Sequence, residues 1–383
     1  MSSRSSRWVR WPGTWFTVAV ALVLAGVLIL SPDRAPTPPS PATSGPPPTA
    51  ASTTVPPVAE EAAWMRPLRP GEKPPQFVLF SFDGAGSHEH WSRYLSLAKS
   101  VNAHFSGFLS GIYLLTDEQR PRYTGPGHKP GAASIGFGGS AAEVATRVQD
   151  LNTAVAAGHQ IGTHYNGHFC AGSEPSVGRW TVPGWTDEIG QFSRFVDDAH
   201  DRLGLHLSAK DVTGGRTPCL EGNWAAAFPA MRDAGYTFDS SQPSDGVKWP
   251  TRLDGIWEFW MPYVQVPALH KKVIMMDYNL WFQFNHAKND PTHAQQYTQA
   301  TLETYRGAYR AAFEGNRAPL VIGNHFNDWA GGAFSRAAEG FMGEVCTKPE
   351  TVCATYAEVT KWMSLQDPAV LDQYRSKPPA QAG

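Results

Sequence analysis

Two histidines four residues apart, His164 and His168, are the residues of this chain whose type and spacing best suit metal binding. A separation of four places both imidazoles on one side of a turn, close enough to share one ion. The preceding run, residues 160–163, is expected to be the end of a strand that opens into a loop. Barrel and open-sheet enzymes place their chemistry at such strand ends. Taken alone, however, a pair with this spacing is a weak indicator of a metal site.

Four further polar residues stand at the ends of predicted strands: Asp83, Arg216, Asp239 and His325. The apolar runs before them alternate with helical patterns, which predicts an α/β fold, either a parallel β/α barrel or a doubly wound sheet. In a barrel the carboxyl ends of the strands meet on one face, so these side chains are expected to lie together. Each residue alone has an ordinary structural explanation (a turn cap, an ion pair, a helix cap or a core histidine). Their joint placement favours a functional site.

These residues belong to short segments in a fixed order: Ser81-Phe82-Asp83-Gly84-Ala85, His164-Tyr-Asn-Gly-His168, Arg216-Thr217-Pro218, Asp239 and His325. The ordered set resembles the five motifs of the polysaccharide deacetylases, the NodB-homology or carbohydrate esterase family 4 enzymes. The resemblance covers roughly residues 75–365, and the surroundings of the third and fourth motifs are most similar to the longer chitin-deacetylase-like branch. It implies an α/β fold, a distorted (β/α) barrel of the polysaccharide deacetylase type.

The resemblance implies hydrolysis of an acetyl group from an N-acetylated or O-acetylated sugar. Asp83 would be the general base that activates water, and Arg216 would hold Asp83 in its ionised form. The backbone N–H of Cys219 would help to stabilise the oxyanion. His325 would protonate the leaving group, with Asp239 supporting the charged imidazolium.

The resemblance also implies a bound divalent metal and a polysaccharide substrate. His164 and His168 would bind the ion, with zinc expected first and cobalt as the alternative. Pro218, Trp224 and Trp329 would contact an acetylated polysaccharide, because aromatic side chains can stack on sugars.

The first motif departs from the family pattern. Where the family has a second aspartate that binds the metal, this chain has Gly84, and Tyr165 replaces a small hydroxyl residue of the second motif. Zinc normally takes at least three protein ligands, so metal affinity is expected to fall. Three outcomes stay open: Asp83 binds the metal instead of acting as the base, a nearby side chain replaces the lost ligand, or no metal binds. The nearby candidates are His88, Glu89 and His90.

The N-terminal part of the chain differs in composition from the rest. Residues 14–30 form an uncharged apolar run long enough to cross a bilayer, and arginines precede it. A cleaved signal peptide would look similar, but residues 28–30 do not form a small-residue cleavage site, which favours an uncleaved anchor over a secreted protein. Residues 31–57 are mostly Pro, Ser, Thr and Ala and are expected to form a spacer. The predicted segments are a cytoplasmic tail (1–13), a transmembrane anchor (14–30), an extracytoplasmic linker (31–70), a polysaccharide-deacetylase-like domain (71–370) and a flexible tail (371–383).

The four cysteines of this exported chain suggest two disulfides. Cys346 and Cys353 would close a short loop and are expected to pair, which leaves Cys170 to pair with Cys219. The alternative is that Cys170 and Cys219 are free thiols or metal ligands, which an oxidising compartment makes less favourable.

The overall charge of the chain does not favour a nucleic-acid partner. A formal net charge of −2 gives no electrostatic reason to expect nucleic-acid binding. We expect a membrane-anchored, extracytoplasmic, metal-dependent deacetylase that acts on a cell-envelope or extracellular polysaccharide. The alternative is a non-catalytic glycan-binding or envelope-structural protein that keeps the barrel. The retained Asp83, Arg216 and His325 favour the enzyme, whereas Gly84 favours the binding protein.

Overall fold

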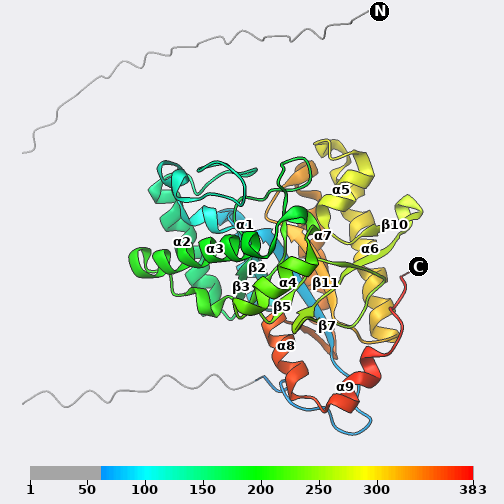
Figure 1. The fold of residues 1–383 in the computed structure, drawn as a ribbon. Coiled ribbons are helices and arrows are strands. Elements are labelled where there is room, and N and C mark those ends of the chain that lie inside the picture. The colour runs from blue at the N-terminus through cyan, green and yellow to red at the C-terminus, as the bar shows by residue number, and fades with distance from the viewer. Residues whose placement is uncertain (1–61, 383) are drawn as a thin grey trace, which may run out of the picture. The chain divides into compact units, whose positions relative to one another are not determined.

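The computed structural model describes residues 62–382 (Figure 1). The predicted cytoplasmic tail, the predicted anchor and residues 31–61 of the predicted linker lie outside the described residues. Between residues 62 and 382, no helix combines the length and the apolar composition that a membrane span requires.

A sheet of nine strands forms the centre of the described chain. Its strands follow the order β11-β1-β2-β3-β4-β5-β8-β7, β12 pairs with β1, and within this sheet only the β7–β8 pair is antiparallel. The strands are β1 (Gln76–Gly84), β2 (Ser106–Leu109), β3 (Gln160–Thr163), β4 (Gly214–Gly215), β5 (Phe238–Asp239), β7 (Thr251–Leu253), β8 (Ile256–Glu258), β11 (Leu320–His325) and β12 (Thr351–Cys353).

A second, smaller sheet of three strands lies between β5 and β11 in the chain order. It contains β6 (Pro243–Asp245), β9 (Met261–Val266) and β10 (Lys271–Ile274). The chain enters it directly after β5, and a parallel bridge between Met276 and Gly323 joins its far end to β11. Strand pairing therefore runs from β11 to β5, the chain passes directly from β5 into the smaller sheet, and the Met276–Gly323 bridge leads back to β11. This arrangement confirms the predicted α/β class and the distorted (β/α) barrel.

Helices follow most of the parallel strands (Figure 1). Sequence signals fix several of their ends: the Ser140 hydroxyl and the Glu143 carboxylate cap each other's backbone N–H groups at the start of α2, and Gly204 ends α3 with a φ of +72°. The helices are α1 (His88–Ser100), α2 (Ala141–Ala156), α3 (Val182–Leu203), α4 (Trp224–Asp233), α5 (Asp277–Asn285), α6 (Ala294–Glu314), α7 (Trp329–Val345), α8 (Tyr356–Leu365) and α9 (Pro368–Arg375).

Strand β1 lies at the centre of the core. Its residues 76–83 are all buried, as expected for a parallel strand covered on both faces. Phe80 packs against Phe341 of α7, and Phe82 packs against Tyr94 of α1, with ring centroids 5.9 and 4.2 Å apart. Burying each such side chain contributes about 1.5–3 kcal/mol. The position of Asp83, the next-to-last residue of β1, is therefore set by a strand whose preceding residues are all buried in the core.

Segments near both predicted domain boundaries contact the domain. The Leu68 N–H donates to the Gln366 side chain at 2.8 Å, and the Tyr374 hydroxyl donates to the Glu72 carbonyl at 3.0 Å. Beyond α9, Ala380 forms an antiparallel bridge with Val247.

Both predicted disulfides are present. Cys170 pairs with Cys219 and Cys346 pairs with Cys353, with Cα atoms 6.0 and 5.4 Å apart. The first bond joins the loop after β3 to the loop after β4, and the second ties the end of α7 to β12. All four cysteines are described, and none of them is a free thiol.

Candidate active site

Five of the predicted residues lie at the carboxyl ends of neighbouring parallel strands. Asp83 is the next-to-last residue of β1 and His325 is the last residue of β11, and the two are direct partners in the pairing of these strands. His164 follows β3, Arg216 follows β4 and Asp239 ends β5. The order β11-β1-β2-β3-β4-β5 brings these strand ends to one face of the barrel.

A cavity of about 810 Å³ opens at this face. The predicted residues that line it are Asp83, His164, His168, Cys219, His325 and Trp329. Arg216 and Asp239 are buried and do not belong to the lining of this cavity. Of the predicted substrate-binding residues, Pro218 is buried, and Trp224 packs on Phe228 with ring centroids 5.6 Å apart. Neither Pro218 nor Trp224 belongs to the lining that the described residues form.

Asp83 is held by a fully buried arginine. Arg216 Nη1 donates to Asp83 Oδ1 at 2.8 Å, and the remaining guanidinium donors bind the Ser240 carbonyl, the Ser240 hydroxyl and the Tyr356 hydroxyl at 2.7–3.0 Å. Burial raises the pKa of the Asp83 carboxyl, but the positive charge of Arg216, with smaller electrostatic contributions from the neighbouring His164 and His325, outweighs burial and lowers the pKa overall. Asp83 is therefore a carboxylate at neutral pH, the state that a general base requires.

His164 presents an unpaired nitrogen in the buried part of the site. Its Nδ1 is 2.8 Å from the Arg216 carbonyl, so Nδ1 carries the proton and Nε2 has a free lone pair. Nε2 is buried and has no hydrogen-bond partner among the described residues. Burial, reinforced by repulsion from His168, lowers the pKa of His164 to about 3. A neutral imidazole whose other nitrogen is fixed by a carbonyl is a typical metal ligand.

His168 completes a pair that fits one metal ion. The His164 and His168 ring centroids are 5.2 Å apart, and burial lowers the pKa of His168 as well. Two imidazoles bound to one tetrahedral zinc ion have centroids about 5 Å apart, given Zn–N bonds of about 2.0 Å. The orphaned Nε2 and this separation fit the implied divalent ion.

A third ligand for the pair is missing. Gly84 has a φ of +84° and lines the cavity, and a Cβ atom built there would lie 3.8 Å from the nearest side chain, an ordinary van der Waals contact. His88 binds Asp150 at 2.8 Å, His90 lies 3.3 Å from Asp328, and neither these histidines nor Glu89 is among the described residues that line the cavity. Of the three outcomes left open by the sequence, replacement of the lost ligand by one of these residues is therefore not supported by their positions.

A buried glutamate in the middle of α3 supports the loop between the two histidines. Glu188 accepts the Asn166 N–H at 2.9 Å and the Tyr123 hydroxyl at 3.0 Å, and the same hydroxyl accepts the Gly167 N–H. Burial raises the pKa of Glu188 to about 7, although the hydrogen bonds from Tyr123 and Asn166 oppose this effect. Glu188 was not predicted, and its signal is an acidic residue on the apolar side of a helix.

The carboxylate that supports His325 is Asp277, not the predicted Asp239. Asp277 Oδ1 lies 2.7 Å from His325 Nδ1, and Asp277 Oδ2 accepts the His325 backbone N–H at 2.7 Å. The bridge between Met276 and Gly323 places Asp277 beside β11, whereas Asp239 belongs to β5, which is not a neighbour of β11. Burial lowers the pKa of His325, but Asp277 and then Asp83 outweigh it and raise the pKa overall.

Asp239 instead forms a carboxylate pair with Glu258. Asp239 accepts the Ser241 hydroxyl at 2.9 Å, and Glu258 accepts the Ser241 and Gln242 N–H groups at 3.1 and 3.0 Å. Burial raises the pKa of Asp239 to about 6 and also raises that of Glu258, as expected for two acids that share a buried site. The pair fixes the loop whose residue Ser240 binds Arg216.

Trp329 is the predicted aromatic residue that reaches the cavity. Its ring centroid lies 4.9 Å from that of His325, and it stacks on Trp281 at 4.9 Å. Tyr278 and Phe326 also line this side. An apolar wall of this kind, beside the catalytic candidates, suits the flat face of a sugar ring.

No family model matches the chain, and no curated protein matches its sequence. Solved structures with a similar fold include a candidate polysaccharide deacetylase from Mycobacterium smegmatis, with 15% identity and a TM-score of 0.48, covering 83% of this chain and 97% of that one. A family 4 carbohydrate esterase from Streptomyces lividans, solved with acetate, has 12% identity and a TM-score of 0.39, covering 75% and 95%. A family 4 pseudoenzyme from Bacillus anthracis has 10% identity and a TM-score of 0.41, covering 76% and 66%. These structures include the family that the sequence motifs resemble, and at this level the similarity concerns the fold alone.

Proposed function

We propose that this protein is a metal-dependent deacetylase that removes acetyl groups from a polysaccharide. The observation that carries the proposal is the pairing of Asp83 with His325 across β1 and β11. The pKa of the Asp83 carboxyl is lowered and that of the His325 imidazole is raised, which favours a carboxylate base and a protonated imidazole acid side by side. Opposite shifts of this kind assign acid and base roles in hydrolases.

The reaction follows from the positions of these groups. A divalent ion bound by His164 and His168 would polarise the acetyl carbonyl and acidify the attacking water. Asp83 accepts the proton of that water, while Arg216 keeps the carboxylate in place. The Cys219 N–H, in a residue that lines the cavity, is the candidate donor to the oxyanion. His325 donates its proton to the leaving amine or alkoxide, and Asp277 stabilises the imidazolium before the transfer.

The proposed setting is outside the cytoplasm. Support comes from the apolar run 14–30 with arginines before it and from the two disulfides, which persist in oxidising compartments. The substrate would then be an acetylated polysaccharide of the cell envelope or its surroundings. Protease added to intact cells should release the domain by cutting within residues 31–57, and protection of that segment would contradict this orientation.

Acetate release tests the activity. The full-length protein, loaded with zinc or cobalt, should release acetate from acetylated glucosamine oligomers or acetylated xylan, and Asp83→Asn should not. Asp254→Asn is the matched control, because Asp254 also accepts an arginine at 2.8 Å, from Arg232 at the surface. Absence of acetate from every acetylated glycan, with metal bound, would contradict the proposal.

A second candidate function is favoured by one observation, the missing third ligand at Gly84. A non-catalytic glycan-binding protein would retain the cavity and Trp329 but release no acetate. This function predicts that the metal-free protein binds acetylated oligomers and that Trp329→Ala loses this binding. It also predicts that the protein releases no acetate with any metal.

A further inference from the structure

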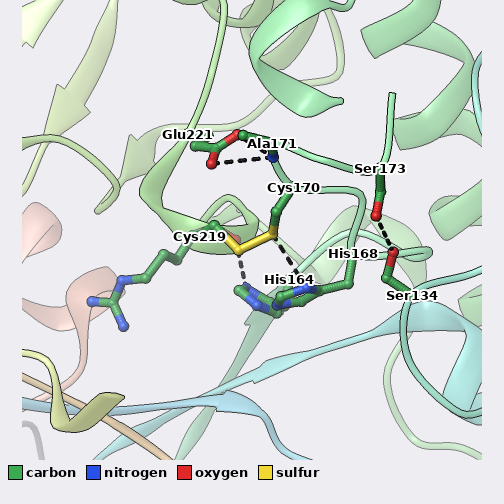
Figure 2. Close-up of a disulfide and its surroundings, with 9 residues drawn as sticks. Ser134, His164, His168, Cys170, Ala171, Ser173, Cys219 and Glu221 are labelled. Atoms are coloured by element: carbon green, nitrogen blue, oxygen red, sulfur yellow. Dashed lines mark hydrogen bonds between the residues drawn. A yellow bond between two sulfur atoms is a disulfide. The ribbon is translucent and has the colours of Figure 1, made fainter. Parts of the chain in front are cut away.

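The disulfide between Cys170 and Cys219 lies beside the histidine pair (Figure 2). Cys170 Sγ is 3.5 Å from His168 Nδ1, and Figure 2 shows both sulfur atoms close to the two imidazoles. We searched residues 62–382 for groups of at least three His, Cys, Asp or Glu side chains whose possible metal-ligand atoms all lie within 4.8 Å of one another. One group among these residues meets this criterion, and it consists of His168, Cys170 and Cys219.

We propose that Cys170, Cys219 and His168 form a redox-controlled zinc site of the Cys2His type. The site is closed while the cysteines form a disulfide, and it binds zinc when a dithiol reduces them. This inference deepens the proposed function. It rests on that function only in that His168 belongs both to the His164–His168 pair and to the Cys2His site. Its two thiolates would be anionic ligands, which the His164–His168 pair lacks.

The distances suit a tetrahedral ion. Zn–S bonds of about 2.3 Å and Zn–N bonds of about 2.0 Å separate a sulfur and a nitrogen ligand of a tetrahedral ion by about 3.5 Å. The observed separation between Cys170 Sγ and His168 Nδ1 is 3.5 Å. The two sulfur atoms need only part from bonding distance to about 3.8 Å to occupy two further corners. Three protein ligands and one open position are the composition of a catalytic zinc site, as in the Cys2His sites of known zinc enzymes.

The environment of this disulfide allows reduction. Cys219 is exposed and lines the cavity, and Cys170 is partly exposed, so a small dithiol can reach the bond. The other disulfide offers an internal comparison, because Cys353 is only 5% exposed and the pair lies outside the cavity lining. His168 is fixed in place independently of the disulfide, since Glu188 and Tyr123 hold the preceding Asn166 and Gly167.

The redox step balances with one dithiol molecule. A thiolate of the dithiol attacks one disulfide sulfur and the Cys170–Cys219 bond breaks; the second thiol then displaces the protein sulfur. Two electrons pass to the protein, both cysteines become thiols, and the dithiol becomes a disulfide. A zinc ion then displaces the two thiol protons and binds two thiolates and the neutral His168 imidazole.

Metal binding tests the site directly. The full-length protein, purified in detergent, is titrated with Co²⁺ and Zn²⁺ before and after treatment with dithiothreitol, and alkylation with peptide mapping records which cysteines are free. We expect thiolate-to-cobalt charge-transfer absorption only after reduction, and zinc affinity at least about 100-fold higher in the reduced state because thiolates are strong zinc ligands. No such absorption in protein with Cys170 and Cys219 shown to be free would overturn the proposal.

Matched variants assign the ligands. Cys346→Ser/Cys353→Ser should behave like the unmodified protein, whereas Cys170→Ser/Cys219→Ser should never show the thiolate absorption. Should the latter fold poorly, His168→Ala tests the same site, because it should lower the zinc affinity of the reduced protein while leaving both thiols free. Thiolate absorption that survives in Cys170→Ser/Cys219→Ser would contradict the assignment. Acetate release plays no part in these measurements, so the inference and the proposed deacetylase activity can fail separately.

Discussion

Replacing Glu188 by Gln should remove a pH dependence of stability that this buried carboxyl imposes. In the folded protein its pKa is about 7, against 4.5 for an ordinary glutamate, because burial disfavours the charged form. Between pH 4.5 and 7 the unfolded chain has released this proton and the folded chain has not. Stability therefore falls as pH rises through this interval, by about 1.4 kcal/mol per pH unit and roughly 3 kcal/mol in total. Above pH 7 the penalty is constant.

The assay compares urea unfolding free energies of the wild type and Glu188→Gln at pH 4.5 and pH 8. The difference between the two proteins should change by roughly 3 kcal/mol in favour of the variant at the higher pH. Other groups with raised pKa values, such as Asp239 and Glu258, are present in both proteins and cancel in the difference. Glu221→Gln is the control, because Glu221 also accepts a backbone N–H, from Ala171 at 2.9 Å, but is partly exposed. A difference that does not change with pH would refute the reasoning.

Three further substitutions test the roles of single groups. Asp83→Asn should reduce acetate release by about 100-fold or more while metal content, measured by elemental analysis, stays near that of Asp254→Asn; loss of the metal would instead identify Asp83 as a ligand. Gly84→Asp should raise zinc affinity about tenfold in calorimetry, because an added carboxylate would give the histidine pair a third ligand, although the φ of +84° at this position opposes part of the gain. Asp277→Asn should move the alkaline limb of the pH–rate profile to lower pH, because the raised pKa of His325 depends on the Asp277 charge, and an unchanged limb would argue against His325 as the acid.

The strand ends and the cysteine pairs could be predicted because their signals are local. Each apolar run that ends in Asp83, His164 or His325 became a buried parallel strand, and parallel strands necessarily place their carboxyl ends together. The disulfide pairing followed from the short loop between Cys346 and Cys353, which left one partner for each remaining cysteine.

The partner of His325 could not be predicted in the same way. Asp239 and Asp277 both follow short apolar runs, and the choice between them depends on which strand approaches β11. That choice is made by the Met276–Gly323 bridge, a contact between distant segments that no local pattern contains. The predicted role of Trp224 illustrates the same limit, because an aromatic residue at the start of a helix can face the cavity or the protein, and here it packs on Phe228.

Tyr356 has a consequence for how the protein is made. Its hydroxyl binds Arg216 at 3.0 Å and lies 3.1 Å from the Ser81 hydroxyl, 275 residues earlier in the chain. Strand β1 likewise pairs with β11 and β12, the last two strands along the described residues, which are synthesised long after β1. A growing chain therefore holds β1 with β2 as its paired neighbour but without β11 and β12 until almost the whole domain has been synthesised, and such an open strand edge is prone to aggregate. A chain that stops before α8 would also leave Arg216 short of a partner.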